Sequence, residues 1–486
     1  MTPLPAPINL LSQGKWPLSF EANRSVGEVS QRAWSLLISP SGDMMKRRKT
    51  KRALPKVSAA SAKNALRTFA ITLQSKISGF YLQAIAFSVA FLMVCARRPD
   101  AILNAQFYAE DGRVWYLDAY NLGLHSLFMP QGGYLNTLSR IVALIALLFP
   151  LSLAPLVMNL CAIVVQILPV NIFLSSRFSG IPLKTRLLGS LFYLAIPNAA
   201  EIHATITNAQ GHLALAACLV LLARPASGRV WRIFDGAVLV MISVSSPIGI
   251  LLVPVAAVLW WKRRQGWSAL TLALLVPGAI VVGLIALFTH DRMVAPNGPT
   301  FSRFAAILGR QVFLSSLLGR NTQDWLLQLR YVHLVEGIAT VAGLAVLLYA
   351  LRYGQMELRL FVLIAYAAFA LGLVRPLAGL PDRPQWEWLC VPGCGNRYYF
   401  LPMLAFLASL LWKASRRASP MALRSIAVAL LLLMPIGIYR DWKYPPFSDL
   451  HFSKYAAQFE KAPPGTKIVI PINPSTHWNL ELTKHE

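Results

Sequence analysis

Long apolar segments, separated by short polar and basic ones, make up most of the chain. Runs of nearly twenty apolar residues recur from Ile77 almost to Tyr439. Each run can cross a hydrocarbon core of roughly 30 Å as a helix, because a helix satisfies its backbone hydrogen bonds internally. The pattern therefore predicts an all-α polytopic membrane protein.

The predicted transmembrane domain covers residues 77–439 and holds about eleven to thirteen helices. The spans are expected at residues 77–96, 138–151, 155–175, 187–197, 208–223, 233–261, 270–288, 331–351, 358–374, 398–412 and 425–439. The segment 233–261 leaves two alternatives open. As one helix it gives eleven spans. A break at the SVSSPIG stretch would make it a hairpin, and one segment between Leu138 and Pro197 would then be re-entrant or interfacial.

Composition agrees with this class and adds an orientation. The chain is 56% hydrophobic and 14% charged, with a mean hydropathy of +0.52, outside the range of ordinary soluble domains. Its net charge of +26 comes from short basic clusters between apolar runs, such as Lys46–Arg52 and Lys262–Arg264. Such clusters face the cytoplasm in membrane proteins, so we expect a cytoplasmic N-terminus and no nucleic-acid partner.

The regions outside the spans follow from this orientation. Residues 1–76 are basic and lack a long apolar run, which predicts a disordered cytoplasmic extension. Outer loops are expected at residues 97–136, 289–330 and 375–397, followed by a short extracytoplasmic tail, 440–486. In the second loop, Arg303 and Arg310 lie seven residues apart in an apolar segment, which predicts a helix along the membrane interface. The tail should hold a short amphipathic helix and one strand, KIVIPI.

Two of the five cysteines are close enough in sequence to form a disulfide. Cys390 and Cys394 flank a Pro-Gly turn in CVPGC, within a loop predicted to lie outside, so either a disulfide or two free thiols fits the sequence. No metal-ligand spacing of the HExxH or repeated CxxC kind occurs in the chain.

The first outer loop contains the candidate catalytic residues, two adjacent acids. In QFYAEDGRVWYLDAY, Glu110 and Asp111 are adjacent carboxylates at the start of a predicted surface helix. One interpretation is an N-terminal cap, since the helix dipole favours anions there. The other is a functional pair beside Tyr108 and Trp115 at the level of the lipid headgroups. Arg140, near the start of the next span, can pair with Asp111 or with a lipid phosphate.

The order of these features resembles a known superfamily. FYAEDG, PQGGYLNTLSR, LAPL, ATITNAQGHLAL and RYYFLP follow one another as in bacterial multispan proteins of the C-type (GT-C) glycosyltransferases, relatives of protein mannosyltransferases, lipid A aminoarabinose transferases and oligosaccharyltransferases. The resemblance covers the layout of roughly residues 77–439, and the family's acidic motif falls on Glu110 and Asp111. It implies a hexosyltransferase-like enzyme in a bacterial inner membrane, with a sugar donor on polyprenyl phosphate or diphosphate.

The chain departs from the family in the next outer loop. Many relatives carry a further Asp there, whereas EIHATITNAQGH offers Glu201 and His203. We therefore assign both residues to substrate binding and no residue firmly to a metal. If a divalent cation acts as cofactor, Glu110 and Asp111 are its expected ligands.

The chemistry explains the choice of residue types. An acceptor hydroxyl that attacks an anomeric carbon must lose a proton, which a nearby carboxylate can take. The phosphate leaving group needs a cation, and Arg397 in GNRYYFLP is the leading candidate, followed by Arg140. For both arginines the competing interpretation is an interfacial anchor. Glu336, an acid just inside a span, is interpreted by default as functional, and the alternative is that it reaches water or pairs with Arg330.

Two other functions compete with glycosyl transfer to an envelope glycan, glycolipid or protein. A transporter or flippase of lipid-linked sugars would show internal repeats and charges near the bilayer midplane, but no repeat is visible and the charges cluster at span ends. An assembly partner for envelope polysaccharide is suggested only by the basic extension and the short tail.

Overall fold

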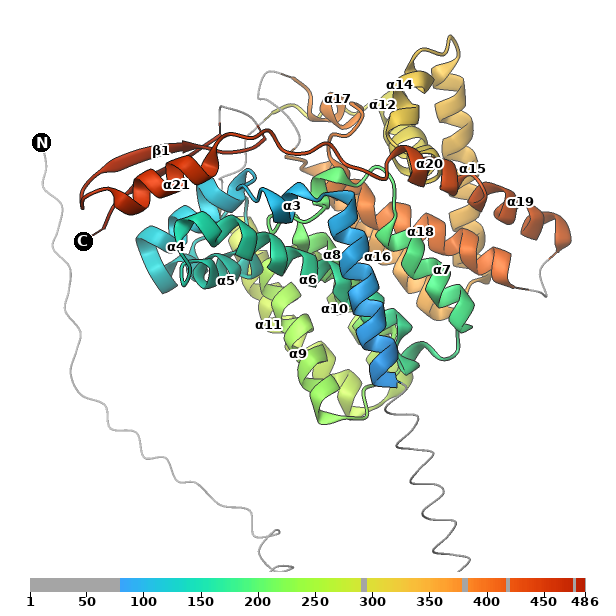
Figure 1. Ribbon diagram of the computed structural model, residues 1–486. Helices are drawn as coiled ribbons and strands as arrows, with labels where there is room; N and C mark the ends of the chain where they lie inside the picture. The colour runs from blue at the N-terminus through green and yellow to red at the C-terminus, as the bar shows by residue number, and fades with distance from the viewer. Residues whose placement is uncertain (1–78, 290–294, 378–382, 417–419, 475–477, 486) are drawn as a thin grey trace, which may run out of the picture. The chain divides into compact units, whose positions relative to one another are not determined.

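The computed structural model describes residues 79–289, 295–377, 383–416, 420–474 and 478–485. The predicted N-terminal extension and small parts of the two later outer loops lie outside the described residues. The described chain is mostly helical and contains one two-stranded antiparallel sheet, which lies in the tail (Figure 1). The predicted helical fold, with a helical first outer loop, is thus confirmed.

Six helices in the described residues are long and apolar enough to cross a membrane. They are Gly79–Arg97, α6 (Ala154–Leu174, preceded by the turn η3, Leu151–Leu153), α11 (Gly266–Phe288), α15 (Val332–Tyr353), α16 (Met356–Val374) and the pair α19 (Met421–Leu431) and α20 (Met434–Arg440). Shorter or less apolar helices pack among them: α7 (Leu183–Leu194), α8 (Ala209–Leu222), α9 (Arg229–Ser245), α10 (Ile248–Arg263) and α18 (Asn396–Ser415). The chain is a multi-pass membrane protein.

The long apolar segment at residues 233–261 is broken. Helix α9 ends at Ser245, the backbone is extended at Ser246, and α10 begins after Pro247. The turn is tight, because a Cβ on Gly249 would lie 2.8 Å from the Cα of Ser243. The single-helix alternative is therefore wrong and the hairpin alternative is correct.

The predicted span 138–151 does not cross a membrane. Its helix α5 (Thr137–Ala146) has ten residues, about 15 Å, which is half the hydrocarbon thickness. Thr137 donates a hydrogen bond to the carbonyl of Val244 at the α9–α10 turn, and the amide of Ser152 donates to Glu460 in the tail. Both ends of this segment thus stay on one side of the bundle, as the hairpin alternative requires.

Basic residues gather at the other end of the helices. Arg177 binds the carboxylate of Asp235 at 2.8 Å and the carbonyl of Arg224, which ties the α6–α7 and α8–α9 connections together. Arg416 donates to the carbonyl of Tyr353 and so joins the α15–α16 and α18–α19 connections. Other cations of these connections are Lys184, Arg229, Arg232, Lys262, Arg263, Arg264, Arg352, Arg359 and Arg424. This basic end lies opposite the end that carries Glu110.

The end opposite the basic end is built from connecting segments with short helices. These are α3 (Asp100–Leu103), η1 (Asp111–Tyr116), α4 (Leu117–Leu122), η2 (Gly123–Phe128), α12 (Phe301–Ala305), η6 (Ala306–Leu314), α13 (Ser315–Leu318), α14 (Asn321–Leu327) and α17 (Gln385–Leu389). The carboxylate of Asp441, just past α20, accepts backbone N–H bonds from Asn198 and Arg320 and so holds two of these segments together.

The second of the long connections differs from its prediction. Segment η6 is a π-helix, in which the chain advances with i→i+5 hydrogen bonds, so the seven-residue spacing of Arg303 and Arg310 does not place them on one exposed face. Arg303 is partly exposed, whereas Arg310 is buried and binds Glu336 at 2.7 Å. The interfacial helix is therefore wrong for Arg310, and Glu336 pairs with Arg310, not with Arg330.

The tail folds back over the first outer loop (Figure 1). Helix α21 (Phe452–Lys461) packs on the hairpin of β1 (Lys467–Pro471) and β2 (Asn479–Thr483), in which Ile470 pairs with Leu480. The predicted amphipathic helix and strand are both present. Strand β2 contacts η1 and α4, so the tail rests on the segment that follows the two carboxylates.

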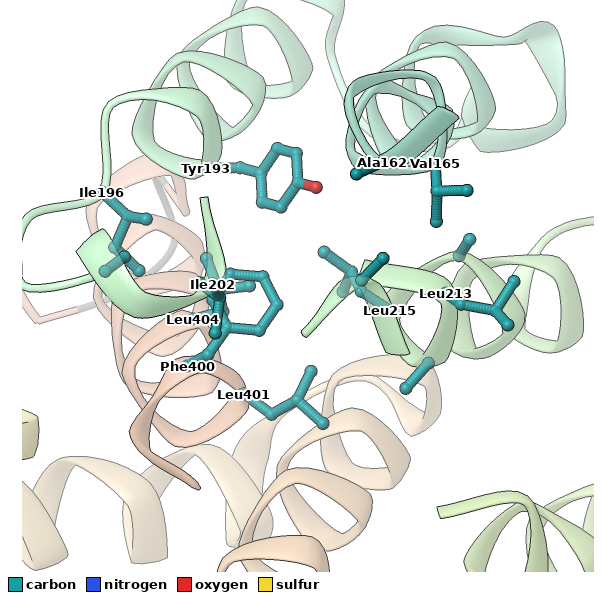
Figure 2. Packing of buried hydrophobic residues seen from close by; sticks show 14 of the residues in the cluster. Ala162, Val165, Tyr193, Ile196, Ile202, Leu213, Leu215, Phe400, Leu401 and Leu404 are labelled. Carbon is teal, nitrogen blue, oxygen red and sulfur yellow. The ribbon is translucent and has the colours of Figure 1, made fainter. Parts of the chain in front are cut away.

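A close-packed core joins α6, α7, α8 and α18 beneath this end. Figure 2 shows the ring of Tyr193 near that of Phe400, with Ala162, Leu215 and Leu404 around them. The ring centroids of Tyr193 and Phe400 lie 6.0 Å apart, and the Tyr193 hydroxyl donates to the carbonyl of Gln166. This core fixes the helix ends on which the candidate site is built.

Candidate active site

The backbone that presents the two carboxylates is held in an unusual conformation. Ala109, which precedes them, has φ of +47°, a region that residues other than glycine rarely adopt. Its amide donates to the carbonyl of Asn473 in the tail, and the amide of Asn473 donates to the carbonyl of Phe107. We call these two bonds the Asn473 clamp. Directly after it, Asp111 begins a π-helical turn, a feature frequent at functional sites.

Asp111 is buried and bound to another segment. Its side-chain oxygen Oδ1 accepts the amide N–H of Thr207 at 2.9 Å and the Thr207 hydroxyl at 2.5 Å. The indole of Trp115 donates to the same hydroxyl. Burial raises the pKa of Asp111 to about 7, against the opposing effect of the Thr207 hydrogen bonds. Asp111 therefore links the first outer loop to residues 205–207 and does not cap its own helix.

This raised pKa predicts a pH-dependent stability. The folded protein holds the Asp111 proton more tightly than the unfolded chain, so the contribution is complete below pH ~4 and is lost as pH rises through about 7. Relative to Asp111→Asn, the wild type should lose stability between about pH 4 and pH 7 and then level off. Unfolding midpoints in detergent across this range measure the difference. Parallel curves for the two proteins would contradict it.

Glu110 is in a different environment from its neighbour. It is half-buried, and among the residues that the structure describes it has no hydrogen-bond or ion-pair partner. The pKa of the nearby Tyr108 phenol shows which charges lie around Glu110. Burial is the largest cause that raises this pKa, and the carboxylates of Glu201 and Glu110 raise it further. The guanidinium groups of Arg397 and Arg98 lower it. Glu110 and Glu201 thus both lie close enough to Tyr108 to affect its phenol, and the charge of Glu110 also acts on Arg397.

Arg397 is a cation that lies near these acids. It forms an ion pair with Glu201, donates to the carbonyl of Leu377, and lies 5.0 Å from the ring centroid of Tyr398. The Tyr398 hydroxyl in turn accepts the amide of Leu377 at 2.8 Å. Since the Arg397 side chain remains 35% exposed, some of its five N–H donors are accessible to an anion. The structure therefore brings Arg397 and Glu201 together beside Glu110.

The glycines of PQGGYLNTLSR form a turn next to this site. Gly132 and Gly133 both have positive φ, +63° and +90°, between Gln131 and Tyr134, whose backbones are hydrogen-bonded to each other. Such a turn favours glycine, which adopts positive φ without steric cost. A Cβ on Gly132 would lie 3.7 Å from Leu377, which places the turn at the edge of the Arg397 site.

Arg140 lies behind the site. It is 1% exposed, and its guanidinium binds Asp118 at 2.9 Å and the carbonyl of Leu135 at 3.0 Å. It also lies 5.0 Å from the ring centroid of Trp115, the residue that supports Thr207. Its ion-pair partner is thus Asp118, not Asp111, and its contact with Trp115 links it to Thr207, which binds Asp111.

His203 is also fully engaged within the protein. Its Nε2–H group lies 2.9 Å from the carbonyl of Val94, and Nδ1 lies 3.1 Å from the amide nitrogen of Gln166. Burial and the nearby cations Arg97 and Arg98 lower the pKa of His203 well below its usual value, so the ring is neutral. His203 anchors the loop that carries Glu201, and we do not place it in contact with substrate.

The remaining predictions concern cysteines and metals. Cys390 and Cys394 are both free thiols, which decides against the disulfide alternative. Among the described residues, three or more His, Cys, Asp or Glu side chains do not converge as a metal site would require. The carboxylate of Asp111 is bound to Thr207, whereas Glu110 has no partner among the described residues, so the two acids do not share one environment.

Two residues of the site carry no recognisable signal in the sequence. Thr207 lies within the ATITNAQ stretch, but nothing there indicates that it holds Asp111. Asn473 lies far along the chain, and its backbone bonds to Phe107 and Ala109 depend only on the folded tail.

Comparisons with known proteins found only distant structural similarity. No family model matches the chain, and neither does any curated protein. Similar solved structures include the Archaeoglobus fulgidus oligosaccharyltransferase tethered to an acceptor peptide, at 11% identity and a TM-score of 0.38. Another is archaeal AglB from the same organism in complex with an inhibitory peptide and a dolichol-phosphate, at 12% identity and a TM-score of 0.30. Each match covers 79% of this chain and 58% of the other, and similarity this remote assigns no family.

Proposed function

We propose that the protein is a membrane glycosyltransferase that moves a sugar from a polyprenyl-phosphate carrier to an acceptor outside the cytoplasm. The observation that carries the proposal is the placement of Glu110, a carboxylate without a partner among the described residues, beside the partly exposed Arg397. This pair lies at the end of the helices opposite the basic end. Because basic loops face the cytoplasm, the N-terminus is cytoplasmic and Glu110 faces outward.

The geometry suggests separate roles for the two acids. Glu110 acts as the base: it takes the proton of the acceptor hydroxyl as the oxygen attacks the anomeric carbon. The bond from that carbon to the phosphate oxygen breaks, and the phosphate leaves with the electron pair. Arg397 stabilises this charge, while Glu201 holds the guanidinium in position. Asp111, protonated in part near neutral pH, keeps the loop in place through Thr207.

Mass spectrometry of cells tests the proposal. Deletion of the protein should remove one sugar increment from envelope glycans, glycolipids or glycoproteins and cause one polyprenyl-linked sugar to accumulate. Purified protein in vesicles should then transfer that sugar to the acceptor. If the vesicles move the lipid-linked sugar across the membrane without any acceptor and transfer nothing when it is added, the protein is a flippase and the proposal is wrong.

A further inference from the structure

A large apolar cavity lies at the basic end of the helices, far from Glu110. Its volume is about 510 Å³, within the usual range of small-molecule and cofactor sites. The walls come from α6, α7, α8, α16 and α18 and are mostly aliphatic and aromatic, with Phe173, Phe361 and Leu407 among them. Apolar walls of this kind suit a hydrocarbon chain.

The cavity is separate from the candidate active site. Along α18, Arg397 comes first, Phe400 packs against Tyr193 and His212, and the cavity lining begins only at Leu404. The core shown in Figure 2 therefore closes the cavity on the side of the active site. A single ligand does not occupy both places.

The length of the cavity indicates which lipid it fits. Its lining on α18 runs from Leu404 to Ser415, which is about 17 Å of helix, and Arg416 follows just beyond the helix end. One leaflet of a bilayer contributes roughly 15 Å of hydrocarbon. The cavity therefore matches a chain from one leaflet and is too short for a chain that crosses the whole membrane.

The polar end of the cavity carries more positive than negative charge. Arg416 lines it, the guanidinium of Arg224 lies close to the lining residue Gly180, and Arg359 binds the carbonyl of Gly354 beside it. Glu357 is the acidic residue that lines the same end. The surplus of guanidinium groups suits a phosphate headgroup.

One further observation concerns the wall itself. Ser190 of α7 lines the cavity and is 6% exposed, and its hydroxyl has no hydrogen-bond partner in the described part of the chain. A hydrocarbon chain offers this hydroxyl no hydrogen bond, so Ser190 is a polar position that does not add to the affinity of the wall for lipid.

We propose that this cavity binds one acyl chain of an anionic phospholipid from the leaflet at the basic end, with the lipid phosphate on Arg416 and Arg224. The inference does not depend on the proposed enzymatic function, since it involves other residues at the opposite end of the helices. The bound lipid acts as a structural component that fills the space between α7, α16 and α18.

The test measures lipid retained by the purified full-length protein. Native mass spectrometry in detergent, with phosphatidylglycerol and phosphatidylcholine offered at equal concentration, should show one phosphatidylglycerol bound to the wild type. Ala408→Trp, which fills the cavity, should abolish binding, and Arg416→Gln should weaken it about fivefold and reduce the preference for the anionic lipid. Leu363→Trp, on an exposed surface of α16, and Lys262→Gln, an exposed cation at the same end, should bind as the wild type does.

Several outcomes would overturn the proposal. A monodisperse Ala408→Trp protein that retains the lipid places the lipid elsewhere. Equal binding of both lipids, or unchanged binding by Arg416→Gln, removes the headgroup assignment. If polyprenyl phosphate displaced phosphatidylglycerol at a lower concentration, the cavity would be a site for the sugar carrier. If the wild type retained no phospholipid, the cavity would not be a phospholipid site.

Discussion

Replacing Glu110 by glutamine is expected to lower the rate of sugar transfer by about 10²- to 10⁴-fold, the usual contribution of a general base. The variant keeps the shape of the side chain but cannot accept the proton. Since Glu110 forms no hydrogen bond or ion pair with other described residues, the fold should be unaffected. Initial rates of transfer from a polyprenyl-phosphate sugar, measured on purified protein with an equal unfolding midpoint, give the result.

Two matched variants make this measurement decisive. Glu460→Gln, an exposed acid in the tail, should transfer at the wild-type rate. Asp111→Asn should alter stability and its pH dependence more than the rate, because its carboxylate is bound to Thr207. If Asp111→Asn lost all transfer while Glu110→Gln remained active, the roles of the two acids would be reversed.

Removing the charge of Glu336 should destabilise the protein by roughly 3–5 kcal/mol, the typical cost of leaving a buried charge unpaired. Glu336 and Arg310 are each about 3% exposed and lie 2.7 Å apart. In Glu336→Gln the guanidinium of Arg310 keeps its bonds to Gln323 and to the carbonyl of Cys390 but loses its counterion. Denaturation midpoints in detergent report the change.

A comparable ion pair nearby serves as the control. Arg303 and Glu387 lie 3.1 Å apart, but their side chains are 30% and 44% exposed, so Glu387→Gln should cost no more than about 1 kcal/mol. The double variant Arg310→Met, Glu336→Leu should recover most of the lost stability, since an apolar pair leaves no buried charge. A loss below about 1 kcal/mol in Glu336→Gln would show that water reaches Arg310.

The sequence predicts those parts of the fold that depend on local composition. Apolar length locates the long spans but wrongly includes the segment 138–151, and the turn chemistry of SVSSPIG correctly offers a break in the segment 233–261. The position of Glu110 and Asp111 in a connecting segment also follows from the sequence. These features require no knowledge of which segments meet.

The sequence does not predict which residues from distant segments pair with one another. Arg140 pairs with Asp118, Arg310 with Glu336, and Asp111 with Thr207, because helix packing brings these residues together. The interfacial prediction for Arg310 assumed the residue spacing of an α-helix, and the π-helix η6 has a different spacing. Charge and hydropathy identify which residues need a partner but not which partner they find.

The Asn473 clamp has a consequence for biosynthesis. The backbone at Ala109 takes its conformation from a segment made much later, which must itself reach the same side of the membrane. During insertion the first spans therefore assemble with Glu110 on a loop that is not yet fixed. Under the proposed function, the site is complete only when the tail has folded onto this loop, so we expect a chain that stalls before Asn473 to be inserted but inactive.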